Sequence, residues 1–232
     1  MMKKKINIWL GVFVIGAFSI ISLAQDPPRT MAANSVYVVK NKPYSADSIS
    51  ETVQTLVDGN KITRISKNKV HRDSEGRTRR EDLPSGLVSA NYLSLRETIT
   101  ITDPIAGFNY YLNPSAKTAR RQPITIKGTL GEKTNNTSGF TTTDANAAVE
   151  KIEGIECTIK SLKTTIAPGA IGNEREIITT SETCYSDDLH IILLSKRNDP
   201  QIGINTTKLA NITRTEPDKS LFTIPSDYKI VN

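Results

Sequence analysis

The fold of this chain is decided by residues 152–186, which read IEGIECTIKSLKTTI (152–166), APGAIGN (167–173), ER (174–175) and EIITTSETCYS (176–186). The first and last of these runs are rich in Ile and Thr, which favour strands. The middle run carries Pro and two Gly, which favour a turn. The stretch therefore predicts two antiparallel strands joined by the loop Ala167–Asn173.

The two cysteines of the chain lie on the two arms of this predicted hairpin. Facing residues of an antiparallel hairpin have a constant index sum, and pairing Cys157 with Cys184 centres the hairpin between Ala170 and Ile171, inside the predicted loop. The cysteines should then face each other within bridging distance, and a disulfide closing this loop would stabilise the fold by roughly 3–4 kcal/mol. The alternative is two unpaired buried thiols, because a one-residue slip or a bulge would turn them to opposite faces.

Other segments along the chain also read as short strands between turns. Thr98, Thr100 and Thr102 alternate with Ile99 and Ile101, which is typical of a half-buried strand. The remaining strand candidates and the tail expected to dock on the sheet are residues 36–39, 69–72, 77–80, 108–112, 118–121, 189–196, 203–214 and 221–230.

Residues 48–66 fit two patterns. Ile49, Val53 and Leu56 have helical spacing, with Ser45 as an N-cap. The β-branched residues of the same segment, followed by Asp58-Gly59, instead predict a hairpin. We favour the hairpin, because Asp-Gly between two such runs is a strong local turn signal.

These segments, with no long helices between them, predict a mainly β protein: a twisted antiparallel sheet or half-open barrel with few short helices. About 200 residues suit one domain of this kind, and we assign residues 35–232 to a single β-rich domain. Residues 128–148 hold little bulk and predict a long mobile loop, with a poorly formed helix at residues 144–151 as the alternative.

The N-terminus has the layout of a secretory signal peptide. Three lysines, Lys3 to Lys5, precede an apolar run from Ile6 to Ile21, and Ser22-Leu23-Ala24 supplies small residues for cleavage. The apolar run is shorter than the ~20 residues that usually span a bilayer. We therefore predict a signal peptide over residues 1–24, a disordered lead over 25–34, and a protein exported to the periplasm or outside the cell.

Removing this leader lowers the formal net charge from +6 to +3. Such a small excess argues against a dedicated nucleic-acid-binding protein. The strongest local charge lies between residues 61 and 82, where a candidate anion-binding patch for lipid or polysaccharide is formed by Arg72, Arg77, Arg79 and Arg80. We favour the alternative of a solvated sheet face with cross-strand ion pairs.

Signals for catalysis are weak throughout the sequence. It has no Gly-x-Ser-x-Gly and no phosphate-binding loop, and its two histidines have no obvious second metal ligand nearby. His190, in an apolar run, is interpreted as buried and hydrogen-bonded, and His71, in a charged hairpin, as solvated. We predict no enzyme, no cofactor and no catalytic or metal-binding residue.

Several blocks resemble a group of uncharacterised exported bacterial proteins, notably from acidobacteria. They are PYSAD (43–47), DGNKI (58–62), RDSEGRTRR (72–80), DPIAG (103–107), APGAIGN (167–173), LSKRNDP (194–200) and LFTIP (221–225). This family implies no known activity. A fainter resemblance, through Phe222, Pro225 and Tyr228, is to periplasmic lipoprotein carriers, which implies a half-open antiparallel barrel with an acyl-chain ligand.

Two hypotheses about function follow. The first is a non-enzymatic envelope protein that binds a hydrophobic or lipidic ligand, or a protein partner, in an apolar concavity. The second is a structural or interaction module of the envelope that uses a sheet edge or the arginine-rich hairpin. An uncharacterised hydrolase is the least favoured alternative and would require convergent carboxylates or a solvent-facing His190.

Overall fold

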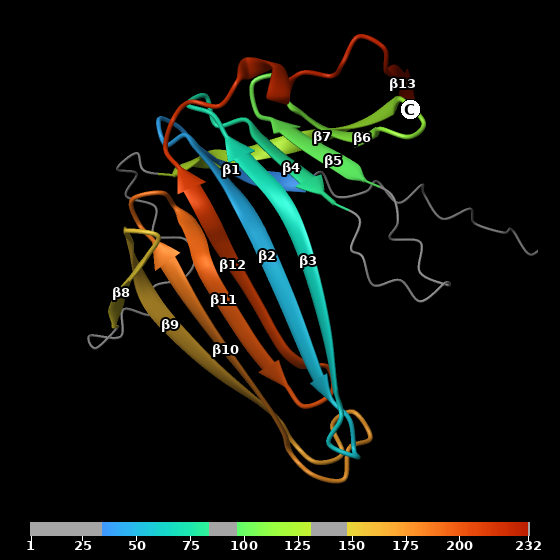
Figure 1. Cartoon of the computed structure of the whole chain (residues 1–232), viewed down its shortest axis with the longest axis vertical. Coiled ribbons are helices and arrows are strands. Elements are labelled where there is room, and N and C mark those ends of the chain that lie inside the picture. The colour runs from blue at the N-terminus through green and yellow to red at the C-terminus, as the bar shows by residue number, and fades with distance from the viewer. Residues whose placement is uncertain (1–33, 84–96, 131–147, 232) are drawn as a thin grey trace, which may run out of the picture. The chain divides into compact units, whose positions relative to one another are not determined.

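The computed structural model describes residues 34–83, 97–130 and 148–231. Residues 33–232 belong to one compact unit (Figure 1). The predicted signal peptide, the disordered lead before Asn34 and most of the predicted 128–148 loop lie outside the described residues. The expectations for these segments and for the domain boundaries therefore stay predictions.

The described residues form one large, open, antiparallel sheet with almost no helix, which confirms the predicted fold class. Its order is β1-β7-β6-β5-β4-β3-β2-β12-β11-β10-β9-β8. Two pairings are parallel: β1 with β7, and β13 with β7. The elements are β1 (Asn34–Val39), β2 (Tyr44–Thr55), β3 (Lys61–Arg72), β4 (Thr78–Asp82), β5 (Thr98–Asp103), β6 (Phe108–Asn113), β7 (Thr118–Leu130), β8 (Val149–Ile152), β9 (Ile155–Ile166), β10 (Ile177–Ser186), β11 (Ile191–Asp199), β12 (Gly203–Thr213), the 3-10 helix η1 (Lys219–Phe222) and β13 (Lys229–Val231).

The ambiguous segment around residues 48–66 is a hairpin, so the helical alternative is wrong. β2 and β3 pair along their whole length, from Tyr44 opposite Arg72 to Thr55 opposite Lys61. In the turn, the Leu56 N–H donates to the Asn60 carbonyl oxygen and the Gly59 N–H donates to the Leu56 carbonyl oxygen. The side chain of Asp58 accepts from the Asn60 N–H at 2.9 Å. Local turn chemistry and the β-branched residues thus outweigh the helical spacing.

The predicted strand over residues 152–166 is divided by a tight turn. Glu153 and Gly154 form a two-residue connection between β8 and β9, and φ is positive at both positions. This Glu-Gly pair lacks the Asn or Asp that marks such turns most clearly. The alternative of a helix over residues 144–151 is wrong for residues 149–151, because these residues belong to β8 (Val149–Ile152).

Two further boundaries differ from the prediction. β7 runs from Thr118 to Leu130, well beyond the short arm expected at 118–121, and its second half pairs with β1. Residues 128–130 of the predicted loop therefore lie in a strand. The predicted strand at 189–196 begins later, because Leu189 and His190 belong to a turn and β11 spans Ile191–Asp199.

Two apolar clusters stabilise the sheet. The first surrounds the predicted disulfide, which the structure contains between Cys157 and Cys184. This cluster is made of Tyr44, Ala46, Ile155, Cys157, Cys184, Leu189, Leu193 and Leu209. The second lies on one face of β5–β7 and contains Ile99, Ile101, Leu112 and Ala119. Ile224 and Tyr228 of the C-terminal segment pack on this second cluster. The tail therefore docks back on the sheet, as the sequence predicts.

Candidate functional site

The four arginines of the predicted anion-binding patch lie in different environments. Arg72 is buried, with 4% of its surface exposed. Its guanidinium donates to the carbonyl oxygens of Lys42 at 2.9 Å and Leu189 at 2.5 Å, and it stacks over the ring of Tyr44. Arg72 thus joins the β2–β3 hairpin to the turn before β11, and its charged group is not available to an anion at the surface.

Arg77 and Arg79 lie beneath the C-terminal segment. The Arg77 guanidinium forms ion pairs with Asp73 at 2.6 Å and Glu75 at 2.9 Å, and it stacks over the Phe222 ring. Arg79 pairs with Glu81 at 2.7 Å and also donates to a backbone carbonyl oxygen of η1. Both side chains are mostly buried, so they act as the polar anchors of the tail.

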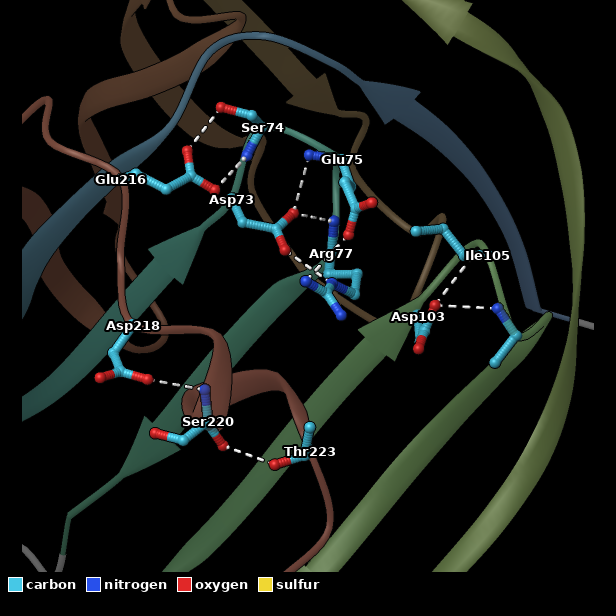
Figure 2. A network of polar contacts seen from close by, with 11 residues as sticks. Asp73, Ser74, Glu75, Arg77, Asp103, Ile105, Glu216, Asp218, Ser220 and Thr223 are labelled. Carbon is cyan, nitrogen blue, oxygen red and sulfur yellow. Dashed lines mark hydrogen bonds and ion pairs between the residues drawn. The ribbon is translucent and has the colours of Figure 1, made fainter.

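The centre of this anchor is the turn between β3 and β4, shown in Figure 2. Asp73, with 1% of its surface exposed, accepts hydrogen bonds at Oδ1 from the backbone N–H groups of Glu75 and Arg77. Glu216 of the tail accepts from both the N–H and the hydroxyl of Ser74. These hydrogen bonds, led by that from the hydroxyl, lower the pKa of Glu216.

Arg80 points to the opposite face of β4. Its guanidinium pairs with Asp82 at 2.7 Å, and half of the side chain is exposed. Of the four arginines it has the most exposed side chain. Anion binding by the patch stays a prediction, while the ion pairs of Arg77, Arg79 and Arg80 fit the alternative that we favoured.

The prediction for His71 is wrong, and that for His190 is confirmed in part. His71 is half-buried rather than solvated, and its Nδ1 shares a hydrogen bond of 2.8 Å with the Ser45 hydroxyl across the β2–β3 hairpin. His190 is hydrogen-bonded as predicted, through its Nδ1 and the Tyr185 hydroxyl at 3.3 Å, but it is half-buried and lies in the turn before β11 with φ of 51°. Of its apolar neighbours in the sequence, Leu189 is buried in the same turn and Ile191 begins β11, so the apolar run begins before the strand does.

No group of three or more His, Cys, Asp or Glu side chains that could hold a metal ion occurs among the residues that the structure describes. Within the same ranges, no helix has the length and apolar character needed to cross a bilayer.

A hollow of about 500 Å³ crosses one face of β9–β12. It is built by register: Ser161 lies beside Glu182, Glu182 beside Lys196, and Lys196 beside Thr206. The next row holds Lys163, Thr180, Asn198 and Ile204. Because side chains alternate between the two faces of a sheet, these residues point to the same side, which we call the groove face.

The groove face is amphipathic. Apolar side chains at its ends are provided by Ile159, Leu194 and Ile204, and the first two also pack against the core around the disulfide. Exposed lysines lie between them, at Lys163 on β9 and Lys196 on β11. Sequence reasoning missed this hollow, because its residues come from four strands and share no spacing along the chain. It also differs from the apolar concavity that we expected, since charged side chains line it.

No family model matches the chain, and no curated protein matches it significantly. Among solved structures, an uncharacterized conserved protein from Thermus thermophilus is 11% identical, has a TM-score of 0.39, and matches over 82% of this chain and 90% of that one. The MucA/MucB complex from Pseudomonas aeruginosa gives 10% identity, a TM-score of 0.39, and coverage of 83% and 59%. A LolA superfamily protein from Nitrosomonas europaea is 8% identical, has a TM-score of 0.32, and matches over 78% of this chain and 90% of that one. At these identities and TM-scores the likeness carries no information on function.

Proposed function

We propose that this chain is an exported, non-enzymatic envelope protein that binds a lipidic ligand with an anionic head group in the hollow on the groove face. The observation that carries the proposal is the pairing of apolar and cationic side chains in one hollow. Its volume, about 500 Å³, falls within the ~300–1,000 Å³ of ordinary ligand sites.

The chemistry of the hollow matches an amphiphile. Ile204 lines the hollow and offers apolar surface to an acyl chain, and burying such surface is favourable by roughly 25 cal/mol per Å². Ile159 and Leu194 continue the apolar surface along the groove face, where they pack against the core. Lys163 and Lys196 place ammonium groups beside that surface, where a carboxylate or phosphate would meet them. Glu182, opposite Lys196, is the one acid among the residues that line the hollow.

Export is supported by two independent features. The sequence of residues 1–24 has the layout of a signal peptide. The disulfide Cys157–Cys184 is of a kind that forms and persists in oxidising compartments and is rare in the cytosol. The proposal therefore assigns the protein to the periplasm or the exterior of the cell.

The test is palmitate binding to the secreted protein, measured by calorimetry. Lys163→Gln/Lys196→Gln should weaken binding, because both lysines lie on the groove face. The matched control is Lys160→Gln/Arg197→Gln, whose side chains lie on the opposite face of the same two strands, and it should bind as the wild type does. Equal weakening in both double variants, or no palmitate binding by the wild type, would refute the proposal.

A second candidate function is a protein-interaction module that uses a sheet edge. β8 pairs only with Ile155–Thr158, so in the described part of the chain the rest of β9 has no strand partner on its outer side. An unpaired edge can accept a strand from another protein, although Lys160 and Lys163 on this edge oppose indiscriminate pairing. Crosslinking from position 162 in cells would capture a specific partner if this function is correct, and would capture none if it is not.

A further inference from the structure

A second hollow, of about 340 Å³, lies on the face of β5–β7 opposite the cluster that the tail covers. It is lined by Thr98, Ile99, Thr100, Tyr111, Leu112, Asn113, Thr118, Arg120 and Val231. It is separate from the groove face of β9–β12, because the two hollows share no residue. Its volume suits a small ligand.

Strand register brings residues far apart in the sequence into one row beside this hollow. Arg80 of β4 lies opposite Thr100, Thr100 opposite Tyr111, and Tyr111 opposite Arg120. Paired residues in neighbouring strands point to the same side of a sheet. The exposed arginine of the predicted patch is therefore grouped with Arg120, rather than with its neighbours Arg77 and Arg79.

Arg120 is exposed and stacks over an aromatic ring. Its guanidinium lies 5.1 Å from the centre of the Tyr111 ring. Among the described residues, no carboxylate forms an ion pair with Arg120, whereas Arg77 pairs with two carboxylates and Arg79 and Arg80 with one each. A stacked guanidinium can still present its N–H groups in a fork that matches a carboxylate.

The charge around this hollow is positive. The parallel pairing of β13 with β7 places Lys229 beside Thr118, on the same side as Arg120. With Arg80 this makes three cations, and Asp82, which pairs with Arg80, is the acid on this face of β4. An anionic ligand would therefore be attracted here.

Four of the lining side chains are short and polar. Thr98 and Thr100 of β5, Asn113 of β6 and Thr118 of β7 carry hydroxyl or amide groups that both donate and accept hydrogen bonds. Apolar surface is also present, from the Tyr111 ring, Val231 and the parts of Ile99 and Leu112 that reach the hollow. Apolar surface beside hydroxyl and amide groups matches a sugar, whose ring carries both C–H and O–H groups.

We propose that this hollow binds a carboxylate-bearing saccharide, such as a uronate unit of an acidic polysaccharide. The Arg120 guanidinium binds the carboxylate in a bidentate manner, with Arg80 and Lys229 adding long-range attraction. The threonines and Asn113 hydrogen-bond the ring hydroxyls. No bond is made or broken, so the site is one of recognition.

The experiment is calorimetric titration of the secreted protein with trigalacturonate, and with maltotriose as a neutral saccharide of equal length. Trigalacturonate should bind and maltotriose should not. Arg120→Gln should weaken trigalacturonate binding about tenfold or more, because a charge-assisted pair is lost. Arg120→Lys should be intermediate, because it retains the charge without the fork.

Arg121→Gln is the matched control. Arg121 is exposed on the other face of the same strand, where it stacks over Phe108, and its substitution should leave the affinity within about twofold. The proposal is overturned if trigalacturonate does not bind, if maltotriose binds equally well, or if both arginine variants weaken binding alike. Inorganic phosphate in the same titration tests whether the site selects a carboxylate. Competition by phosphate at equal concentration would overturn selectivity for a carboxylate.

These outcomes do not depend on palmitate binding, so the proposal can fail or succeed independently of the proposed function.

Discussion

Cys157 lies two residues along β9 from the position that faces Cys184, and the two cysteines are nevertheless joined by a disulfide. The ladder pairs Cys184 with Ile159, which centres the hairpin between Ile171 and Gly172. Side chains on a strand alternate with a period of two, so a shift of two residues leaves both cysteines on the same face. Their Cα atoms are 5.2 Å apart, inside the range for a disulfide.

Removing this disulfide should destabilise the protein. The bridge joins positions 27 apart in the sequence, and in the chain-entropy model a loop of this length contributes roughly 3–4 kcal/mol. Cys157→Ala/Cys184→Ala should therefore lower the free energy of unfolding in urea by about this amount. Wild type treated with reductant should behave similarly, and the double variant should not respond to reductant. An unchanged urea midpoint in the double variant would contradict the prediction.

The register shows how far the sequence could predict this fold. Alternation and turn residues are local signals, and they located the β2–β3, β3–β4, β5–β6 and β9–β10 hairpins. The exact pairing of β9 with β10 depends on how a long loop closes, which turn composition does not determine. The predicted register of β9 against β10 was wrong by two residues. The disulfide prediction is still correct, because a shift of two residues keeps both cysteines on the same face of the sheet.

The candidate sites could not be predicted in the same way, since they arise from contacts between distant strands. Arg72, Arg77, Arg79 and Arg80 are close in the sequence, but burial and strand alternation separate them. Arg120 was not a candidate from the sequence, because its partners Thr100 and Tyr111 come from other strands. One local signal for this hollow was present in the sequence. The alternation of residues along β5 and β6 placed the polar residues of each strand on one face.

Asp73 should contribute strongly to stability. It is almost fully buried, accepts two backbone hydrogen bonds, and pairs with Arg77 at 2.6 Å. Asp73→Asn removes its charge and leaves the Arg77 guanidinium with only the exposed carboxylate of Glu75. Breaking a buried ion pair costs about 3–5 kcal/mol. Chemical denaturation should detect this loss, and Asp82→Asn is the control, because its pair with Arg80 is largely exposed and should cost at most about 1 kcal/mol.

His71 should make stability depend on pH near neutrality. Burial lowers the pKa of His71 below its ordinary value of 6.5, and the nearby charges act in both directions: Glu81 and Asp47 raise it, while Arg79 and Lys69 lower it. The unfolded chain therefore binds a proton at a higher pH than the folded protein. Stability is fully present above pH 6.5 and falls as the pH drops from there through the folded pKa.

Thermal unfolding at a series of pH values between about 7.5 and about 5 measures this effect. His71→Asn should remove the slope around pH 6, since Asn does not titrate. The carboxylates with lowered pKa, Asp188, Asp199, Glu216, Asp218 and Asp227, contribute stability that is lost only at lower pH, below their ordinary values. An unchanged slope in His71→Asn would show that another group is responsible.

Gly76 and Gly107 provide a matched test of how closely β1 packs on the β3–β4 turn. Both have positive φ, 87° and 77°, so an alanine at either position incurs the left-handed penalty of about 1–2 kcal/mol. A Cβ atom at Gly76 would also lie 2.5 Å from Val38 Cγ1 and 3.0 Å from the Val39 carbonyl oxygen, whereas at Gly107 it would meet nothing within 4 Å. Gly76→Ala should therefore lower the free energy of unfolding by about 1–3 kcal/mol more than Gly107→Ala does. Equal losses in urea titrations of the two variants would mean that β1 does not pack against this turn.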